Sequence, residues 1–238
     1  MSEPTMSEPA APAWLDPPYL FADYRSTVLR SPSRALIVPP PGRTELTGPA
    51  FGDGDVRDTD ADLTAHGDAE PIGERIIVHG RVTDAAGRPV RHTLVEVWQA
   101  NAAGRYVHPN DQHSAPLDPN FVGAGRCLTD ADGAYRFVTI KPGPYPWRNH
   151  HNAWRPAHIH FSVFGRAFTQ RLITQMYFPG DPLFFQDPIY NAVRDERTRR
   201  RMISRYDHAV TSAQWATGYR FDVVLDGADA SVFEEATA

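Results

Sequence analysis

The residues best suited to chemistry lie between Lys141 and Phe164. In this stretch His158 and His160 are separated by one residue, in a run that then becomes apolar. On a β-strand alternate side chains point to the same face, so both imidazoles would lie on one side. A strand also holds them at a fixed separation at little entropic cost, which suits half of a metal site. The pair alone is moderate evidence, because cupins, zinc enzymes and chance also produce it.

Two tyrosines accompany the histidine pair. Tyr145 lies in the proline-rich run K-P-G-P-Y-P, which predicts a stiff loop and not a helix or a central strand. Tyr106 ends the run N-A-A-G-R-Y, directly after an expected strand. Because the phenol pKa is about 10, tyrosine is a poor ligand for divalent ions, whereas a hard, trivalent metal favours the phenolate oxygen. Two tyrosines with two histidines therefore indicate ferric iron.

A ferrous site of the type with two histidines and one carboxylate is the alternative metal centre. Such a site needs an Asp or Glu close to the histidine pair. No acidic residue lies between Tyr145 and His160, which favours the ferric interpretation.

Arg155 precedes His158 by three residues. Its guanidinium is a permanent, planar cation that can stabilise negative charge as it develops in a reaction. A salt-bridging arginine at a strand edge is the structural alternative, and residue type alone favours it. Four nearby aromatic residues have the same ambiguity between core and pocket: Trp98, Trp147, Trp154 and Tyr177.

Composition excludes several classes of protein. The chain has 238 residues, 41% of them hydrophobic, and a formal net charge of −5, so it carries no basic footprint for nucleic acid. It has neither an apolar run of membrane-spanning length nor a signal-like start, so we expect a cytoplasmic protein without a membrane partner. The single cysteine, Cys127, is expected to be a small buried hydrophobe, with a reactive thiol as the weaker alternative.

The elements that would position these residues are mostly strands. Alternating apolar segments bounded by turn residues are R-I-I-V-H-G-R-V-T-D, T-L-V-E-V-W-Q-A, Y-R-F-V-T-I, H-I-H-F-S-V-F, R-L-I-T-Q-M-Y-F and Y-R-F-D-V-V-L. The turn D-A-D-G between C-L-T and Y-R-F-V-T-I predicts a hairpin. Only Asn191 to Tyr206 looks helical. This pattern predicts an all-β fold, a β-sandwich or partly closed barrel of mixed strands with long loops.

Three regions follow from the composition along the chain. Residues 1–13 are rich in Pro, Ala, Ser and Glu and predict a mobile arm. Residues 14–74 form an irregular, proline-broken extension that is apolar enough to pack on the core or on a partner. Its acidic part, Asp53 to Glu70, is better explained as a solvated loop than as a calcium site. Residues 75–238 form the expected catalytic β-sandwich domain, with one short C-terminal helix.

A set of motifs extends along the chain: W-Q-A-N-A-A-G-R-Y, L-D-P-N-F, G-R-C-L-T-D, T-I-K-P-G-P-Y-P-W-R-N, W-R-P-A-H-I-H-F and L-I-T-Q-M-Y-F. Together they resemble the intradiol ring-cleavage dioxygenases, over roughly Asp23 to Leu225. Such continuity is more specific than any one motif. Catechol-cleaving members carry a long helical N-terminal dimerisation segment. The short, proline-broken segment of this chain favours the protocatechuate branch.

The resemblance implies a role for each site residue. The implied ligands of Fe(3+) are Tyr145 and His158 in axial positions, and Tyr106 and His160 in equatorial positions. Arg155 and Gln175 would line the reacting face, with Tyr145 as the base for a substrate proton. The implied substrate-binding residues are Tyr24, Trp98, Trp147, Tyr177 and Ile189.

The implied activity is intradiol cleavage of protocatechuate (3,4-dihydroxybenzoate) by O2 at a non-heme Fe(III) site. The product would be 3-carboxy-cis,cis-muconate, in the β-ketoadipate pathway of aromatic catabolism. The implied partner is a homologous, shorter α chain, in a hetero-oligomer of αβ units. Two alternatives stay open: the same chemistry on catechol or hydroxyquinol, and a non-catalytic β-sandwich scaffold. A scaffold should have a degraded ligand set, and here the set is complete.

Overall fold

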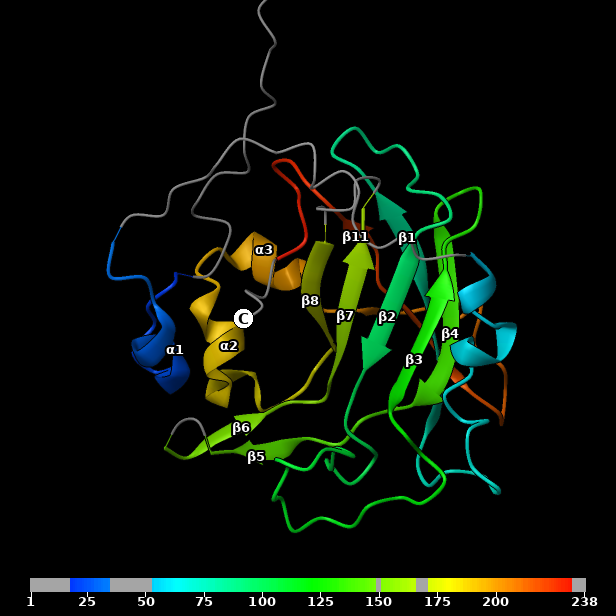
Figure 1. Ribbon diagram of the computed structural model, residues 1–238, viewed down its shortest axis with the longest axis horizontal. Helices are drawn as coiled ribbons and strands as arrows, with labels where there is room; N and C mark the ends of the chain where they lie inside the picture. Colours follow the sequence, from blue (N-terminus) through cyan, green and yellow to red (C-terminus); the bar gives the residue numbers. More distant parts are fainter. Residues whose placement is uncertain (1–17, 35–52, 149–150, 166–170, 233–238) are drawn as a thin grey trace, which may run out of the picture.

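Two packed β-sheets form the centre of the molecule in a computed structural model, which describes residues 18–34, 53–148, 151–165 and 171–232. The first sheet is entirely antiparallel and lies in front in Figure 1. From one edge to the other, its strands are β3 (Ala124–Leu128), β2 (Leu94–Trp98), β7 (His158–Phe164) and β8 (Arg171–Tyr177).

The second sheet is built around β1 (Arg75–Thr83). On one side β1 pairs antiparallel with β4 (Ala134–Ile140). On its other side it pairs in parallel first with β10 (Thr217–Arg220) and then with β11 (Val223–Val224). Strand β9 (Arg205–Tyr206) extends the sheet beyond β10. The predicted all-β sandwich of mixed strands is therefore confirmed, and the described strands do not close into a barrel.

The core lies between these two sheets. Alternate residues of β1, among them Ile76, Val78 and Val82, are buried against alternate residues of β2 and β7, such as Val95 and Phe161. This alternation is what the period-two pattern of the sequence predicts, because successive strand residues point to opposite faces. The other face of β7 is thus left for a site.

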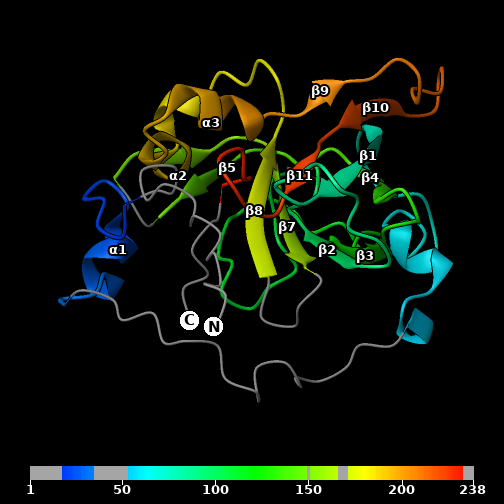
Figure 2. The ribbon, with the colours of Figure 1, turned by 90° about the horizontal axis from the view of Figure 1, so that it is seen from above.

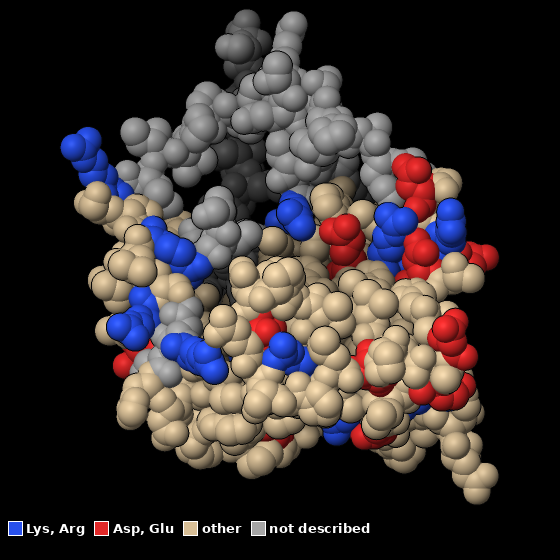
Figure 3. All heavy atoms as spheres, turned by 60° about the horizontal axis from the view of Figure 1, so that its bottom comes forward, with Lys and Arg blue, Asp and Glu red and all other residues tan. Residues whose placement is uncertain are grey.

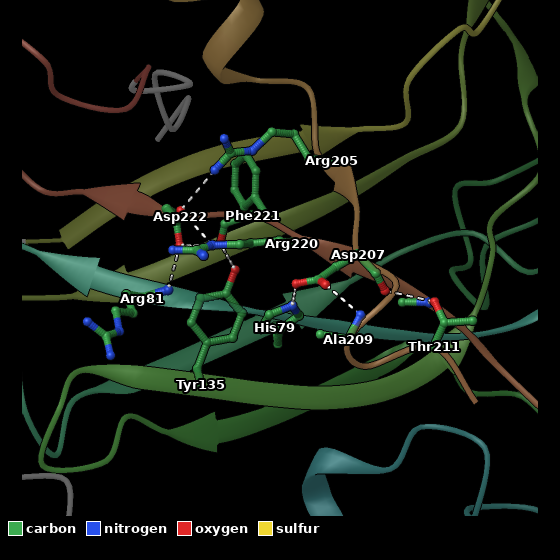
Figure 4. Close-up of polar contacts among 11 residues, drawn as sticks. His79, Arg81, Tyr135, Arg205, Asp207, Ala209, Thr211, Arg220, Phe221 and Asp222 are labelled. Carbon is green, nitrogen blue, oxygen red and sulfur yellow. Dashed lines mark hydrogen bonds and ion pairs between the residues drawn. The ribbon is translucent and has the colours of Figure 1, made fainter.

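Polar contacts attach the C-terminal strands to the second sheet (Figure 4). The Tyr135 hydroxyl of β4 donates to the Phe221 carbonyl at 2.5 Å, and the neighbouring Asp222 carboxylate accepts a backbone N–H of β1 at 3.0 Å. His79 Nε2 lies 2.9 Å from Asp207 Oδ2, in the loop after β9. Phe221 and Asp222 separate β10 from β11, so the predicted continuous strand Y-R-F-D-V-V-L is interrupted there.

The helices are short and lie together beyond the β8 edge in both ribbon views (Figures 1 and 2). They are α1 (Arg25–Arg30), α2 (Pro188–Ala192) and α3 (Glu196–Arg201). Three single turns of 3-10 helix complete the helical content of the described residues: Asp53–Asp55, Asp58–Ala61 and Phe184–Gln186. The prediction of one C-terminal helix is wrong in number, because Val193 is extended and divides the helical region in two. The extension expected to be irregular contains α1.

The predicted hairpin between C-L-T and Y-R-F-V-T-I is wrong. The turn itself is present, with the Asp130 N–H donating to the Ala134 carbonyl at 2.9 Å. The flanking strands then enter different sheets, because β3 pairs with β2 whereas β4 pairs with β1. Turn residues specify the local change of direction and not the strand that each arm pairs with.

Part of the predicted organisation lies outside the described residues. This applies to the arm at residues 1–13 and to residues 14–17 and 35–52 of the extension. Among the described residues, every helix is too short or too polar to traverse a lipid bilayer.

Cys127 lies in the core, as predicted, and only 7% of it is exposed. Burial raises the pKa of its thiol to about 12. At pH 8 we therefore expect negligible thiolate, and no reaction of the native chain with a thiol reagent such as Ellman's reagent. In guanidinium chloride one thiol per chain should react, because an exposed cysteine has a pKa of about 8.5. Rapid stoichiometric reaction of the native protein would contradict the buried role.

Candidate metal centre and active site

The pairing of β7 with its neighbours collects several of the predicted site residues on one face. His160 pairs with Trp98 of β2 and with Gln175 of β8, and His158 pairs with Tyr177. Directly paired residues, and residues two positions along a strand, share one face of a sheet. The residue between the histidines, Ile159, is fully buried in the core. The predicted arrangement of the two imidazoles is thus present.

A two-stranded ribbon supplies the next two residues. Strand β5 (Tyr145–Trp147) pairs antiparallel with β6 (Ala153–Arg155), so Tyr145 lies directly opposite Arg155. The proline-rich run was expected to be a loop, and the structure instead places Tyr145 at the start of this short strand. Pro146 is tolerated there because an isolated ribbon has an edge where no N–H donor is required. Only two residues separate the end of β6 at Arg155 from the start of β7 at His158, so the chain holds these two residues close together.

Tyr106 reaches the site through the long loop after β2. The Asn101 side chain accepts the backbone N–H groups of Ala103 and Arg105, which stabilises a tight turn before Tyr106. This turn packs backbone to backbone against the loop before Tyr145. A Cβ on Gly104, which has φ +79°, would lie 2.2 Å from the Pro144 carbonyl oxygen.

Gly143 makes the reciprocal close approach. Its N–H donates to the Asn101 carbonyl at 2.9 Å, and a Cβ there would lie 2.3 Å from the Ala102 carbonyl oxygen. Only glycine permits such contact between two backbones without displacement. These two glycines bring the loops that carry Tyr106 and Tyr145 together.

The four predicted ligands converge as a result. The ring centroids of Tyr106 and Tyr145 are 5.5 Å apart, and those of Tyr106 and His160 are 6.4 Å apart. The rings of His158 and His160 are 4.9 Å apart, and the Tyr145 hydroxyl lies 3.3 Å from His158 Nε2. Donors from the β2–β3 loop, β5 and β7 therefore face one another.

The contacts of His158 define its tautomer and its protonation state. Its Nδ1 lies 2.6 Å from the Pro156 carbonyl oxygen. A carbonyl can only accept, so Nδ1 carries the proton and Nε2 keeps its lone pair toward Tyr145. Burial, followed by the charges of Arg155 and His160, lowers the pKa of His158 well below its usual range. The imidazole is therefore neutral, which is the form that binds metals.

This donor set fits ferric iron. Among the described residues no cluster of three or more His, Cys, Asp and Glu side chains is arranged to hold a metal. The Tyr145 hydroxyl lies 3.3 Å from His158 Nε2, and the Tyr106 ring lies 6.4 Å from the His160 ring. As phenolates, both tyrosines would be hard donors suited to a trivalent ion. A Pro156 carbonyl that fixes the orientation of His158 is the outer contact usual for a metal-binding imidazole.

Arg155 is embedded in a buried polar network beside the predicted ligands. Only 3% of it is exposed, and its Nε lies 3.1 Å from Asp187 Oδ1. Its terminal nitrogen donates to Gln175 Oε1 and, at 3.2 Å, to the Tyr177 hydroxyl. Arg155 does form an ion pair, as its structural alternative predicts. It is nevertheless buried next to Tyr145 and does not lie on a solvated strand edge.

The remaining predicted pocket residues border the same region. The Trp98 ring stacks on His160 with centroids 4.9 Å apart. The ring centroids of Trp147 and Tyr24 are 4.9 Å apart, and the Trp147 ring centroid lies 5.6 Å from the Arg155 guanidinium carbon. A cavity beside α1 and α2 is bordered by Tyr24, Gln175 and Ile189, among others. Of the four ambiguous aromatics, only Tyr177 is fully buried, and Trp154 is exposed.

Sequence reasoning missed Asp187. The pair Asp187–Pro188 is recognisable as a helix start, because Asp favours the N-cap and Pro the first helical position. The Asp187 side chain does cap α2 by accepting the Ile189 N–H at 2.9 Å. Nothing in the local sequence shows that the same carboxylate also pairs with Arg155.

Comparison with known proteins gives the class of this one. A family model described as Dioxygenase matches residues 46–227, and a second, described as Protocatechuate 3,4-dioxygenase beta subunit N terminal, matches residues 17–41. The chain therefore belongs to the dioxygenase family, and within it to the intradiol ring-cleavage enzymes. It is 58% identical over 220 residues to the protocatechuate 3,4-dioxygenase beta chain of Burkholderia cepacia, which covers 92% of this chain and 93% of that one.

Two more distant relatives agree. The chain is 31% identical over 163 residues to the protocatechuate 3,4-dioxygenase alpha chain of Pseudomonas putida, covering 68% of this chain and 76% of that one. The crystal structure of 3-chlorocatechol 1,2-dioxygenase from Rhodococcus opacus 1CP superposes with a TM-score of 0.53 at 27% identity, covering 71% of this chain and 67% of that chain.

The close approach of the two loops leads to a prediction about Gly143. We expect Gly143→Ala to separate the loops and lower the metal content, with a loss of stability of about 1–3 kcal/mol typical of overpacking. Gly54→Ala is the matched control, because a Cβ at Gly54 meets nothing within 4 Å. Metal analysis and thermal unfolding of both variants measure the effect. Normal metal content in Gly143→Ala would show that the contact does not control the site.

Proposed function

We propose that this chain binds one ferric ion and cleaves protocatechuate between its two hydroxyl-bearing carbons. Both atoms of O2 enter the product, 3-carboxy-cis,cis-muconate, so the reaction balances without a further reductant. The observation that supports this best is the convergence of two tyrosines and two histidines from separate segments. Membership of the intradiol family and the similarity to a protocatechuate dioxygenase beta chain support the same reaction.

The residues that would hold iron are Tyr106, Tyr145, His158 and His160. When bound, ferric iron would supply a Lewis acid that chelates the catechol dianion and draws electron density from its ring. This would make the ring carbons reactive toward O2. Tyr145 would act as the base for the second hydroxyl proton of the substrate, with its phenolate oxygen as the acceptor. The Tyr145 hydroxyl oxygen lies 3.3 Å from Nε2 of the neutral His158. A second polar atom is therefore close to the proposed proton acceptor.

Arg155 would stabilise the negative charge that develops on the substrate ring and its oxygens. Its burial supports this role, because a fixed cation in a site with little water interacts strongly with developing charge. Gln175 accepts from Arg155 and would line the same reacting face. The Trp147 and Ile189 side chains would shape the pocket and limit access of water.

The cavity beside α1 supports protocatechuate over unsubstituted catechol. Its lining includes Arg30, whose guanidinium carbon lies 5.1 Å from the Tyr24 ring centroid. Arg30 and the Tyr24 hydroxyl would provide a cation and a hydrogen-bond donor for the carboxylate that protocatechuate carries and catechol lacks.

Metal analysis and a substrate comparison test the proposal. We expect about one iron per chain of this type, a visible absorption band from phenolate-to-ferric charge transfer, and activity without added ferrous iron. The value of kcat/KM should be highest for protocatechuate among protocatechuate, catechol and hydroxyquinol. A fully active protein that contains zinc, or that requires ferrous iron, would refute the ferric site. A preference for catechol or hydroxyquinol would refute the substrate and leave the chemistry.

We also propose a homologous α chain as the partner. The described part of the N-terminal segment packs Tyr24 on Trp147 but exposes other apolar residues, among them Leu29 at 88%. Exposed apolar surface of this kind usually marks an interface. The face that comes forward in Figure 3, where β5 and β6 lie, also shows broad areas without charged side chains.

Expression with and without an α chain tests this partner. The chain alone should be poorly soluble or of low activity, and co-expression with the α chain should restore both. In the complex, Leu29→Asp should weaken assembly measured by size-exclusion chromatography, whereas Tyr206→Asp, at an exposed aromatic residue of β9, should not. A soluble monomer with full turnover of protocatechuate would show that no partner is needed.

A further inference from the structure

Asp187 is a fully buried carboxylate directly behind Arg155. It lies between the single turn Phe184–Gln186 and α2, and its exposed fraction is 0%. Its Oδ1 is 3.1 Å from Arg155 Nε. A charged pair removed from water in this way is costly unless the remaining hydrogen-bonding capacity of both groups is satisfied.

The second oxygen of Asp187 completes a ring of contacts around Arg155. The Tyr177 hydroxyl donates to Asp187 Oδ2 at 2.9 Å and accepts from the terminal nitrogen of Arg155 at 3.2 Å. Gln175 Oε1 accepts from the same nitrogen of Arg155. The Arg155 guanidinium is therefore held by Asp187 at Nε and by Gln175 and Tyr177 at a terminal nitrogen. Asp187 also contacts Tyr177.

Asp187 also ties this cation to the wall of the pocket. Its Oδ1 accepts the N–H of Ile189 at 2.9 Å and so caps α2. Ile189 borders the same cavity as Tyr24 and Gln175. One carboxylate thus connects the proposed reacting face with the proposed substrate pocket.

We propose that Asp187 is the positioning residue of this site, and that it acts on the reaction through Arg155. A long arginine side chain has many rotamers, and its charge helps a reaction only when the planar fork is held in one orientation. Asp187 selects that orientation and offsets the charge of the buried guanidinium. This inference rests on the proposed function, because it assumes that Arg155 stabilises charge during ring cleavage.

The substitution Asp187→Asn isolates the charge. The asparagine oxygen still accepts the Ile189 N–H, so the cap and the pocket wall stay in place while the anion facing Arg155 is lost. We expect kcat for protocatechuate to fall about 100-fold, the loss typical of a displaced catalytic group. The resting visible spectrum should be unchanged, because Asp187 is not one of the proposed ligands, and Asp187→Glu should recover part of kcat.

Asp195→Asn is the matched control. Asp195 is the N-cap of the next helix, α3, where it accepts the Thr198 N–H at 2.6 Å, and none of its described contacts involves Arg155. If Asp187 contributed only as a helix cap, both variants would lose stability together and keep kcat. We expect kcat to fall in the Asp187 variant alone.

A double-mutant cycle identifies the route of the effect. Arg155→Leu alone should lower kcat by about 100- to 1,000-fold. In that background, adding Asp187→Asn should change kcat by less than about 3-fold, because the residue it positions is gone. Additive losses would overturn the proposal, and so would a kcat of Asp187→Asn equal to that of the unmodified protein.

Substrate binding without oxygen gives a readout independent of turnover. The dissociation constant of protocatechuate, measured anaerobically from the shift of the visible band, should change far less than kcat in Asp187→Asn. If that variant does not fold, the Arg155→Leu/Asp187→Asn double variant should fold, as judged by circular dichroism, because it no longer buries an uncompensated cation. An unfolded double variant would overturn the coupling. If the unmodified protein, co-expressed with the α chain, had no iron or no turnover, the proposed function itself would be refuted.

Discussion

The pairing of β7 between β2 and β8 is the constraint on which the whole site depends. A slip of one residue would exchange the two faces of β7, placing His158 and His160 in the core and Ile159 in the site. The register is held by the apolar residues of the opposite face, since Phe161 and Val163 are fully buried against the second sheet. Hydrophobic packing on one side of a strand thereby sets the positions of the proposed metal ligands on the other.

A buried polar network lies beside that sheet, with Gln175 and Tyr177 on β8, Arg155 on β6 and Asp187 before α2. Arg155, Gln175, Tyr177 and Asp187 contact one another at a place where apolar side chains would pack without a desolvation cost. Buried ion pairs are weak contributors to stability, so stability gives little reason for this one. Local conflict with the rules of a hydrophobic interior is typical of functional sites. The network holds one cation beside the proposed metal ligands, which agrees with the role proposed for Arg155.

The N-terminal segment connects the site to the outer surface. Tyr24 precedes α1 and contacts Trp147 of β5, which in turn lies against the Arg155 guanidinium. Thr27 is the buried residue of α1, whereas Leu29 faces outward. A partner that covers this helix would therefore pack against a segment that borders the pocket. This arrangement gives a physical reason why assembly and activity should depend on each other.

Local patterns in the sequence determined the parts of this protein that depend on neighbouring residues. The alternation in H-I-H-F-S-V-F predicts that both histidines share a face, and the donor types indicate ferric iron. The all-β class followed from the period-two segments, and the resemblance to a known family named the remaining site residues. The strand pattern is expressed within a few consecutive residues, where side-chain direction and turn chemistry act directly. The donor set and the family resemblance depend on the residue types of motifs spread along the chain, which can be read without knowing how these motifs pack.

Only the tertiary structure decided how distant segments meet. The turn after β3 was predicted, but its two arms join different sheets because β1 and β2 offer separate pairing edges. Tyr106 meets Tyr145 because Gly104 and Gly143 let two loop backbones approach closely. Asp187 was readable as a helix cap, yet its pairing with Arg155 arises from the packing of the α2 region against β6 and β8. Such contacts depend on packing across the whole chain, which short-range sequence patterns do not encode.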